Sequence, residues 1–222
     1  MDNQLNLFFS KKYENDINFR MLENDYYFPA NDVLSYIREL NEICVDEYVQ
    51  WLNDHFCTTI LSIEDAIQYS NFEDATKKVV EVIIEAGNKG FTHLEVGKLL
   101  QNDGVIRTDG AYTKYGENHA KTATYLGYLF SIKRFYYVSA IGYVLFKLSL
   151  EEQEKLFVRL FLRTNLFKTV YYLAKNGNVS MRDIFDMLSE KTYIRRKSNI
   201  YYFFQKLKNE KSCIKIIESI TY

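Results

Sequence analysis

Residues 114–127, KYGENHAKTATYLG, combine small side chains with side chains that hydrogen-bond to nucleic-acid bases. A helix over about 117–126 would place Ala120, Ala123 and Leu126 on one face, packed closely on a neighbouring helix. The opposite face, at spacings of three and four residues, carries Lys114, Asn118, Lys121, Thr122 and Tyr125. Asparagine bonds adenine through two contacts, threonine touches a thymine methyl, and lysine reaches guanine or phosphate. This face is therefore predicted to read duplex DNA in the major groove.

Glycines bound this predicted helix, and a basic turn follows it. Gly116 is expected to allow close backbone approach at a helix N-terminus, where amides favour phosphate, and Gly127 to end the helix. YLFSI and FYYVS then form a predicted hairpin, with Lys133 and Arg134 at its tip. A basic tip suits contact with backbone phosphate, which positions a protein without reading sequence. The alternative is a solvated turn that happens to be basic.

A second basic helix is predicted near the C-terminus, since residues 191–211 hold seven Lys or Arg and one acid. Its predicted buried face consists of Ile200, Phe203, Phe204 and Leu207. The residues predicted to contact DNA are Arg195, Arg196, Lys197, Asn199, Tyr202 and Lys206. The alternative interpretation is that these charges only keep the protein surface solvated and do not contact DNA.

The elements around both helices follow the same order. In the first copy, EDATKKVVEVIIEAG is a predicted helix, and THLEVGKLL opens with a capping box of Thr92 and Glu95. In the second, LFKTVYYLAKNG precedes SMRDIFDML, and CIKIIES follows as a predicted strand. EEQEKLFVRLFLR is a predicted linking helix. A winged helix-turn-helix has this order of elements: a helix, a capped helix, a loop, a second long helix and a hairpin.

The N-terminal region differs in charge from the rest. Residues 1–74 hold 4 Lys+Arg and 15 Asp+Glu, a net of −11, whereas residues 75–222 hold 24 and 14, a net of +10. Such asymmetry indicates a nucleic-acid partner for the basic part, or two solvated faces that attract each other. Residues 17–22 and 26–28 are strand candidates, and NDVLSYIRELNEI and DEYVQWLNDHF are predicted helices.

We therefore predict a mainly α protein with two tandem winged helix-turn-helix domains behind a small acidic α+β or helical domain. The predicted domains are residues 1–72, 73–150 and 151–222, the last including the linking helix. No apolar run spans a bilayer and the N-terminus lacks the order of a signal peptide, so no membrane partner and a cytoplasmic location are expected.

Catalytic and metal-binding motifs are not recognised. His119-Ala120-Lys121 begins like the His-x-Lys-x4-Asp of phospholipase-D-type nucleases, but Leu126 stands at the aspartate position. Cys44, Cys57 and Cys213 are far apart, which signals neither a zinc site nor a disulfide framework. We expect no metal and no cofactor, and favour a protein that is not an enzyme.

Two stretches resemble known families. GAYTKYGENHAK and the residues after it, within about 75–150, resemble a winged-helix module of bacterial restriction endonucleases and related defence proteins, which implies duplex DNA binding. LNLF and INFRMLENDYYFPANDVLSYI resemble the N-terminal domain of phage antirepressors of the Bro type.

The expected function is sequence-specific binding of double-stranded DNA, as the recognition part of a restriction or phage-defence system. The alternatives are a small type II restriction endonuclease with an unrecognised site, a transcriptional regulator or antirepressor, and a protein-interaction module whose basic half meets an acidic protein. The acidic N-terminal domain is a possible surface for a protein partner.

Overall fold

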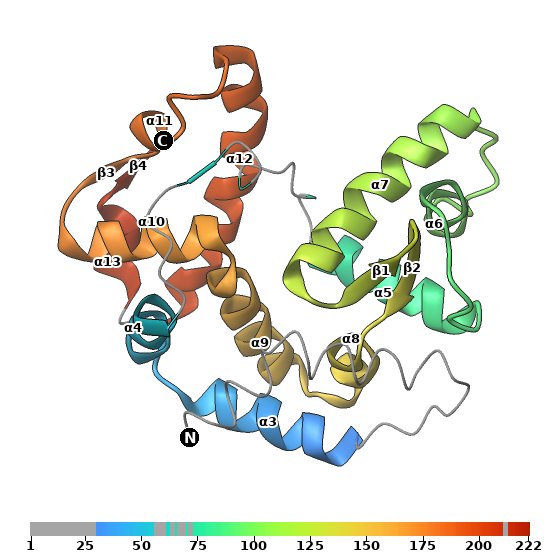
Figure 1. Cartoon of the computed structure of the whole chain (residues 1–222), viewed down its shortest axis with the longest axis horizontal. Coiled ribbons are helices and arrows are strands. Elements are labelled where there is room, and N and C mark those ends of the chain that lie inside the picture. The colour runs from blue at the N-terminus through green and yellow to red at the C-terminus, as the bar shows by residue number, and fades with distance from the viewer. Residues whose placement is uncertain (1–29, 56–60, 63–64, 66–69, 71–72, 211–212) are drawn as a thin grey trace. The chain divides into compact units, whose positions relative to one another are not determined.

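The computed structural model describes residues 30–55, 61–62, 65, 70, 73–210 and 213–222 (Figure 1). These residues are mainly helical, with two small two-stranded sheets, which confirms the predicted fold class at this level. The chain divides into two compact units. Unit 1 comprises Met1–Glu42 and Phe72–Glu154, and unit 2 comprises Ile43–Asn71 and Lys155–Tyr222. Both strands predicted before residue 30 lie outside the described residues.

Both helices predicted near the N-terminus are present, as α3 (Ala30–Glu42) and α4 (Val45–His55). The first belongs to unit 1 and the second to unit 2, so the described helices of residues 1–72 are divided between the units. Val33, Ile37 and Leu40 of α3 are buried, as their spacing of three and four residues predicts.

Unit 1 follows α3 with further helices and one hairpin. In chain order these are α5 (Glu73–Glu85), α6 (His93–Leu100), α7 (Asp109–Leu126), β1 (Leu129–Ile132), β2 (Phe135–Val138), α8 (Ala140–Val144), η1 (Leu145–Lys147) and the start of α9 (Leu150–Arg163).

Local signals set the ends of these helices. The predicted capping box opens α6: the Thr92 side chain accepts from the Glu95 amide, and the Glu95 carboxylate accepts from the Thr92 amide at 2.7 Å. Gly127 ends α7 with a left-handed φ of 88°, as predicted, and its N–H returns to the carbonyls of Ala123 and Thr124. These caps satisfy amides and carbonyls that a helix end leaves without partners.

Helices α6 and α7 lie next to each other (Figure 1). Glycines on both helices allow their close approach. A β-carbon at Gly97 would lie 1.9 Å from the Tyr112 carbonyl oxygen, and one at Gly116 would lie 2.0 Å from the His93 carbonyl oxygen. Ala120 and Ala123 are fully buried on the same helix, as their small size predicts. The small residues of α7 therefore hold it tightly against its neighbours.

The hairpin lies beside α7 and is tied back to the start of α6. Strands β1 and β2 pair antiparallel, with Leu129 opposite Val138 and Ile132 opposite Phe135. Phe91, just before α6, forms an isolated antiparallel bridge with Tyr136, with N–H to carbonyl distances of 3.1 and 2.9 Å. The predicted hairpin is thus present, and Lys133 and Arg134 are its turn.

Unit 2 contains α4, the rest of α9 and the elements up to the C-terminus. These are α10 (Asn165–Asn176), β3 (Val179–Ser180), α11 (Met181–Ile184), α12 (Glu190–Lys206), η2 (Leu207–Asn209), α13 (Ile214–Glu218) and β4 (Ile220–Thr221).

Aromatic rings form the core of unit 2. Phe203 of α12 lies 5.4 Å from Phe157, 5.7 Å from Phe161 and 5.3 Å from Phe167, measured between ring centroids, and all four are buried. Arg159 is also buried, and its guanidinium donates to Glu210 at 3.1 Å and to the Ile43 carbonyl at 2.7 Å. A buried cation needs such partners, so this contact fixes the start of α4 and the end of η2 to α9.

The predicted strand CIKIIES is wrong, because its residues form α13. Isoleucine favours strands, but Cys213 and Ile217 are spaced four apart and both are buried, so packing of one helical face overrides that preference. The short strands β3 and β4 pair parallel, and among the described residues no hairpin follows α12. The second copy therefore departs from the first after its long helix.

Candidate nucleic-acid interface

The helix predicted from about 117 begins earlier, at Asp109, with Thr108 as its N-cap. The Thr108 side chain accepts from the Ala111 amide at 3.3 Å, and Asp109 places a carboxylate in the first turn. Gly116 consequently lies in the middle of α7, where it contacts α6. The prediction that it opens a helix toward phosphate is wrong.

Lys114, Glu117 and Lys121 form the centre of the outward face of α7. Glu117 accepts from Lys114 at 2.9 Å and from Lys121 at 2.6 Å. These two hydrogen bonds lower the pKa of Glu117 to about 2, so its charge is present at neutral pH. Glu117 was not among the residues predicted to contact DNA, although its spacing of three and four residues from the two lysines indicates both ion pairs.

The remaining predicted contacts on α7 differ in exposure. Asn118 and Tyr125 are half-buried. Thr122 is fully buried, and its hydroxyl donates to the Asn118 carbonyl at 2.9 Å, so the prediction that it contacts DNA is corrected. The helix is rotated so that Thr122 faces the interior beside Ala123. We define the α7 face as Lys114, Glu117, Asn118, Lys121 and Tyr125.

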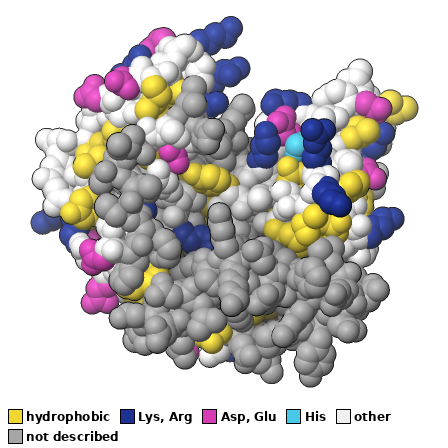
Figure 2. Space-filling view, in the orientation of Figure 1, with side chains coloured by type: hydrophobic (Ala, Val, Ile, Leu, Met, Phe, Trp, Pro, Cys, Tyr) yellow, Lys and Arg dark blue, Asp and Glu magenta, His cyan; other side chains and the backbone are white. Residues whose placement is uncertain are grey.

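His93 and Tyr136 border the α7 face, and neither was predicted there. Nε2 of His93 lies 2.7 Å from the Tyr136 hydroxyl, and the two rings stack with centroids 5.0 Å apart. Partial burial lowers the pKa of His93, opposed by the charge of Glu117 and aided by those of Lys121 and Lys114. His93 is therefore mostly neutral at pH 7. Figure 2 shows a histidine surrounded by lysine or arginine side chains and an acidic one.

The hairpin tip, Ile132 to Phe135, carries two cations on an unusual backbone. Lys133 and Arg134 have φ of 48° and 71°, and both side chains are exposed. Positive φ at both central residues is what a type I′ turn needs, and Asn-Gly normally supplies it. In lysine and arginine that conformation costs about 1–2 kcal/mol per residue.

The loop between α6 and α7 also presents side chains to solvent, and no sequence signal pointed to it. Ile106 is 94% exposed and Val105 is 55% exposed. Arg107 binds both carboxylate oxygens of Asp103 at 2.7 and 2.6 Å, and the Tyr112 hydroxyl donates to the Val105 carbonyl at 3.1 Å. Polar contacts, rather than apolar packing, thus fix this loop.

Helix α12 in unit 2 presents part of its predicted basic set. Arg195 is exposed, whereas Arg196, Lys197, Tyr202 and Lys206 are half-buried. Asn199 is only 7% exposed and lies beside buried Ile200, so its predicted contact with DNA is corrected. The four predicted apolar residues of this helix are indeed buried.

No metal centre or membrane helix appears in the described part of the chain. Among these residues, no group of three or more His, Cys, Asp and Glu side chains is arranged to hold a metal ion. Cys44 is exposed, Cys213 is buried, and both are free thiols. None of the described helices has the length and apolarity required to span a bilayer.

Comparison of the chain with protein-family models, with curated proteins and with solved structures found no match. No family membership follows from these comparisons.

Proposed function

We propose that this protein binds duplex DNA through a winged helix in unit 1, with α7 in the major groove and the hairpin tip on the phosphate backbone. The observation that carries the proposal is the strained hairpin tip, which exposes Lys133 and Arg134 beside a helix whose outer face carries two further lysines. Lys133 and Arg134 are exposed, so neither their strained backbone nor their charge contributes to packing of the core of unit 1.

The order of elements supports this proposal. Helix α5 is followed by the Phe91 bridge, the capped helix α6, the long helix α7 and the hairpin β1–β2. A winged helix-turn-helix has this order, and its second long helix enters the major groove. The glycine contacts between α6 and α7 supply a rigid base for such a helix.

The roles of individual residues follow from their chemistry. Lys114 and Lys121 carry long cationic side chains that reach phosphate or guanine, and Asn118 is assigned to an adenine edge. Tyr125 is assigned to the sugar–phosphate backbone. Lys133 and Arg134 neutralise phosphates, which strengthens binding to all sequences alike.

Unit 2 is proposed to add a further contact with the DNA backbone through α12. Arg195, Lys197 and Lys206 belong to this contact, with Arg196 and Tyr202 beside them. The basic balance of residues 75–222 supports it. We further propose that the chain is the recognition part of a restriction or phage-defence system whose nuclease lies on another chain, and that acidic residues 1–72 bind a protein partner.

The proposal is tested by replacing the turn with Asn-Gly, as Lys133→Asn with Arg134→Gly. Because the strain is relieved, the free energy of unfolding should rise by about 1–2 kcal/mol. Because two cations are lost, affinity for duplex DNA should fall, and the dependence of log K on log salt should shrink by up to about two. Fluorescence anisotropy across a salt series, with chemical denaturation, measures both effects.

The matched control is Lys133→Gln with Arg134→Gln, which removes the charges and keeps the backbone strain. It should lose the same DNA affinity without gaining stability. Absence of duplex binding by the unmodified chain at low salt would refute the proposed function. Unchanged affinity in both variants would remove the hairpin tip from the interface.

A further inference from the structure

The loop between α6 and α7 holds the most exposed large apolar side chain among the described residues. This side chain is that of Ile106, and its neighbour Val105 is also exposed. Single exposed aliphatic side chains are common on protein surfaces and need no explanation. This pair differs from them because hydrogen bonds restrain the backbone on both sides of Ile106 and leave its side chain in water.

Asp103, Arg107 and Tyr112 supply these restraints. The Asp103 carboxylate accepts from the Val105 amide at 3.0 Å, and its two oxygens accept from the Arg107 guanidinium at 2.7 and 2.6 Å. The Tyr112 hydroxyl accepts from the Arg107 amide at 3.3 Å and donates to the Val105 carbonyl at 3.1 Å. The two aliphatic side chains are therefore held in place before any partner binds, which reduces the entropy lost on binding.

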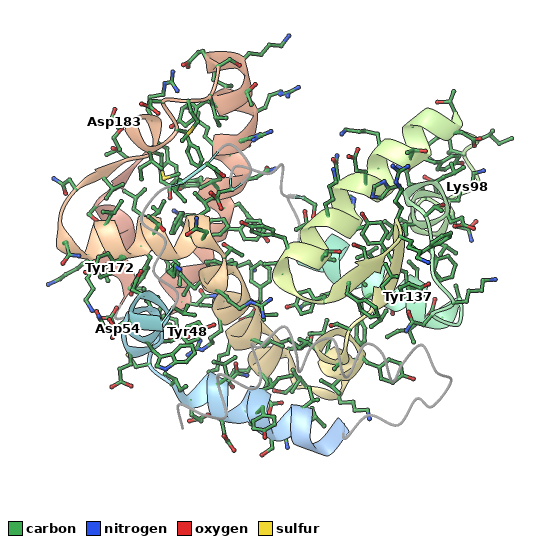
Figure 3. All side chains as sticks on the ribbon, viewed as in Figure 1. Tyr48, Asp54, Lys98, Tyr137, Tyr172 and Asp183 are labelled. Atoms are coloured by element: carbon green, nitrogen blue, oxygen red, sulfur yellow. The ribbon has the colours of Figure 1, made fainter. Side chains whose placement is uncertain are left out.

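The charged side chains around the loop are paired with one another. Asp103 pairs with Arg107, and Asp109 at the start of α7 pairs with Lys98 of α6, which Figure 3 labels, at 3.1 Å. The loop therefore presents apolar atoms with balanced charge, unlike the cationic hairpin tip. Such a surface suits the edge of a base better than a phosphate.

The apolar surface of the loop is too small to form a stable protein interface by itself. Residues 102–104 and 107–110 are all polar residues or glycines, so the loop offers only two aliphatic side chains. Specific protein interfaces bury about 1,200–2,000 Å² in total. A single methyl group on a DNA base, by contrast, can be covered by two side chains.

The loop also lies where the proposed DNA contact needs it. Ile106 precedes Asp109, the first residue of α7, by three residues. The N-terminal residues of a recognition helix contact base edges in the major groove. An apolar group on those edges is the 5-methyl group of a pyrimidine, which thymine carries and which cytosine gains by methylation.

We propose that Ile106, with Val105 beside it, packs against the 5-methyl group of a pyrimidine in the major groove and so selects the base at that position. The inference rests on the proposed binding of duplex DNA by unit 1. It adds a residue that reads a base by apolar contact to the α7 face, which reads bases by hydrogen bonds.

The test removes single methyl groups from the DNA. A preferred duplex is selected from a randomised pool with the full-length protein, and each thymine is then replaced in turn by deoxyuridine, which lacks only the methyl group. Fluorescence anisotropy should show a loss of roughly fourfold at one or two positions. Ile106→Ala should lower the affinity for the selected duplex several-fold and abolish the deoxyuridine effect at those positions, because both changes remove the same contact.

A second arm distinguishes the two sources of the methyl group. Each cytosine of the selected duplex is replaced in turn by 5-methylcytosine. A gain of affinity that depends on Ile106 assigns the site to methylated cytosine, whereas a deoxyuridine loss that depends on Ile106 assigns it to thymine. Either result supports the proposal.

Two further variants separate this contact from general effects. Tyr112→Phe removes the hydroxyl that restrains the loop and changes no charge, so it should weaken methyl discrimination and leave the salt slope unchanged. Leu150→Ala is the matched control, because Leu150 is an exposed aliphatic residue of the same unit at the start of α9, and it should change neither quantity.

Equal affinity for duplexes with and without the methyl groups would overturn the proposal while leaving DNA binding by unit 1 intact. An equal deoxyuridine effect in the unmodified chain and in Ile106→Ala would also overturn it. Loss of self-association in Ile106→Ala with unchanged duplex affinity, measured by sedimentation velocity and anisotropy, would assign the loop to a second copy of the chain and overturn it. If the unmodified chain binds no duplex, the proposed function itself fails, and this inference fails with it.

Discussion

Glu117 lies between the two lysines of the α7 face and governs how much positive charge that face presents. Its carboxylate binds both ammonium groups and remains ionised, with a pKa of about 2. An acid in this position lowers the attraction of the α7 face for phosphate, which in the proposed function favours discrimination between sequences over indiscriminate binding. It also holds both lysine side chains in one orientation.

Glu117→Gln should therefore raise the affinity for random-sequence duplex, by roughly threefold or more at low salt, and steepen the salt dependence. Stability should fall by less than about 1 kcal/mol, because both lysines are exposed. Anisotropy with random and selected duplexes measures the change. A drop in affinity for random DNA would mean that Glu117 serves the interface by positioning the lysines rather than by limiting their charge.

His93 and His119 make stability depend on pH. His119 is buried, with Nδ1 3.0 Å from the Tyr115 carbonyl oxygen and its ring 4.3 Å from that of Tyr115. Burial lowers the pKa of His119, as it does that of His93. Between the lowered values and the ordinary value of about 6.5, the unfolded chain binds more protons than the folded one.

The free energy of unfolding should therefore fall as pH decreases below about 6.5. His119→Asn keeps a donor at the Nδ1 position and should flatten this dependence, and adding His93→Gln should flatten it further. Denaturant unfolding at pH 7.5, 6.5 and 5.5 checks the slopes. Equal slopes in the unmodified chain and the double variant would assign the acid sensitivity to other groups.

At the scale of elements, the contact between α6 and α7 positions the whole α7 face. Gly97→Ala or Gly116→Ala would place a methyl group about 2 Å from a backbone carbonyl oxygen, so the helices must separate. We expect a loss of about 1–3 kcal/mol or more and a matching loss of DNA affinity. Chemical denaturation and anisotropy measure the two quantities.

Gly110→Ala is the matched control, because its β-carbon would meet nothing within 4 Å and the residue lies in the first turn of the same helix. Alanine there should be neutral or stabilising by up to about 1 kcal/mol. Equal destabilisation by all three substitutions would show that helix propensity, and not close packing, explains these glycines.

At the scale of the whole molecule, two different units in one chain predict an asymmetric DNA site. In unit 1 a hairpin follows α7, whereas in unit 2 the elements η2 and α13 follow α12. The two proposed DNA contacts therefore differ in structure. Arg195→Gln with Lys197→Gln should lower the salt slope and shorten a nuclease footprint at one end only. An unchanged footprint and slope would leave unit 1 as the sole DNA-binding part.

The sequence by itself determined the features that depend on neighbours along the chain. Thr92 with Glu95 predicted the capping box, Gly127 the end of α7, and Lys133-Arg134 the turn between two aromatic strands. The apolar spacing of α3 and α12 predicted their buried faces. These features rest on local hydrogen bonds and helical periodicity, which a sequence displays directly.

Tertiary structure alone decided the features that depend on distant contacts. Tertiary contacts bury the side chains of Thr122 and Asn199 and place Gly116 against α6. They also make residues 214–218 helical, where the isoleucines had predicted a strand. The tertiary structure also brought Tyr222 against α12 and Tyr136 against His93, residues 21 or more positions apart in the chain. Burial is set by what packs against a side chain, and neither propensity nor spacing specifies that partner.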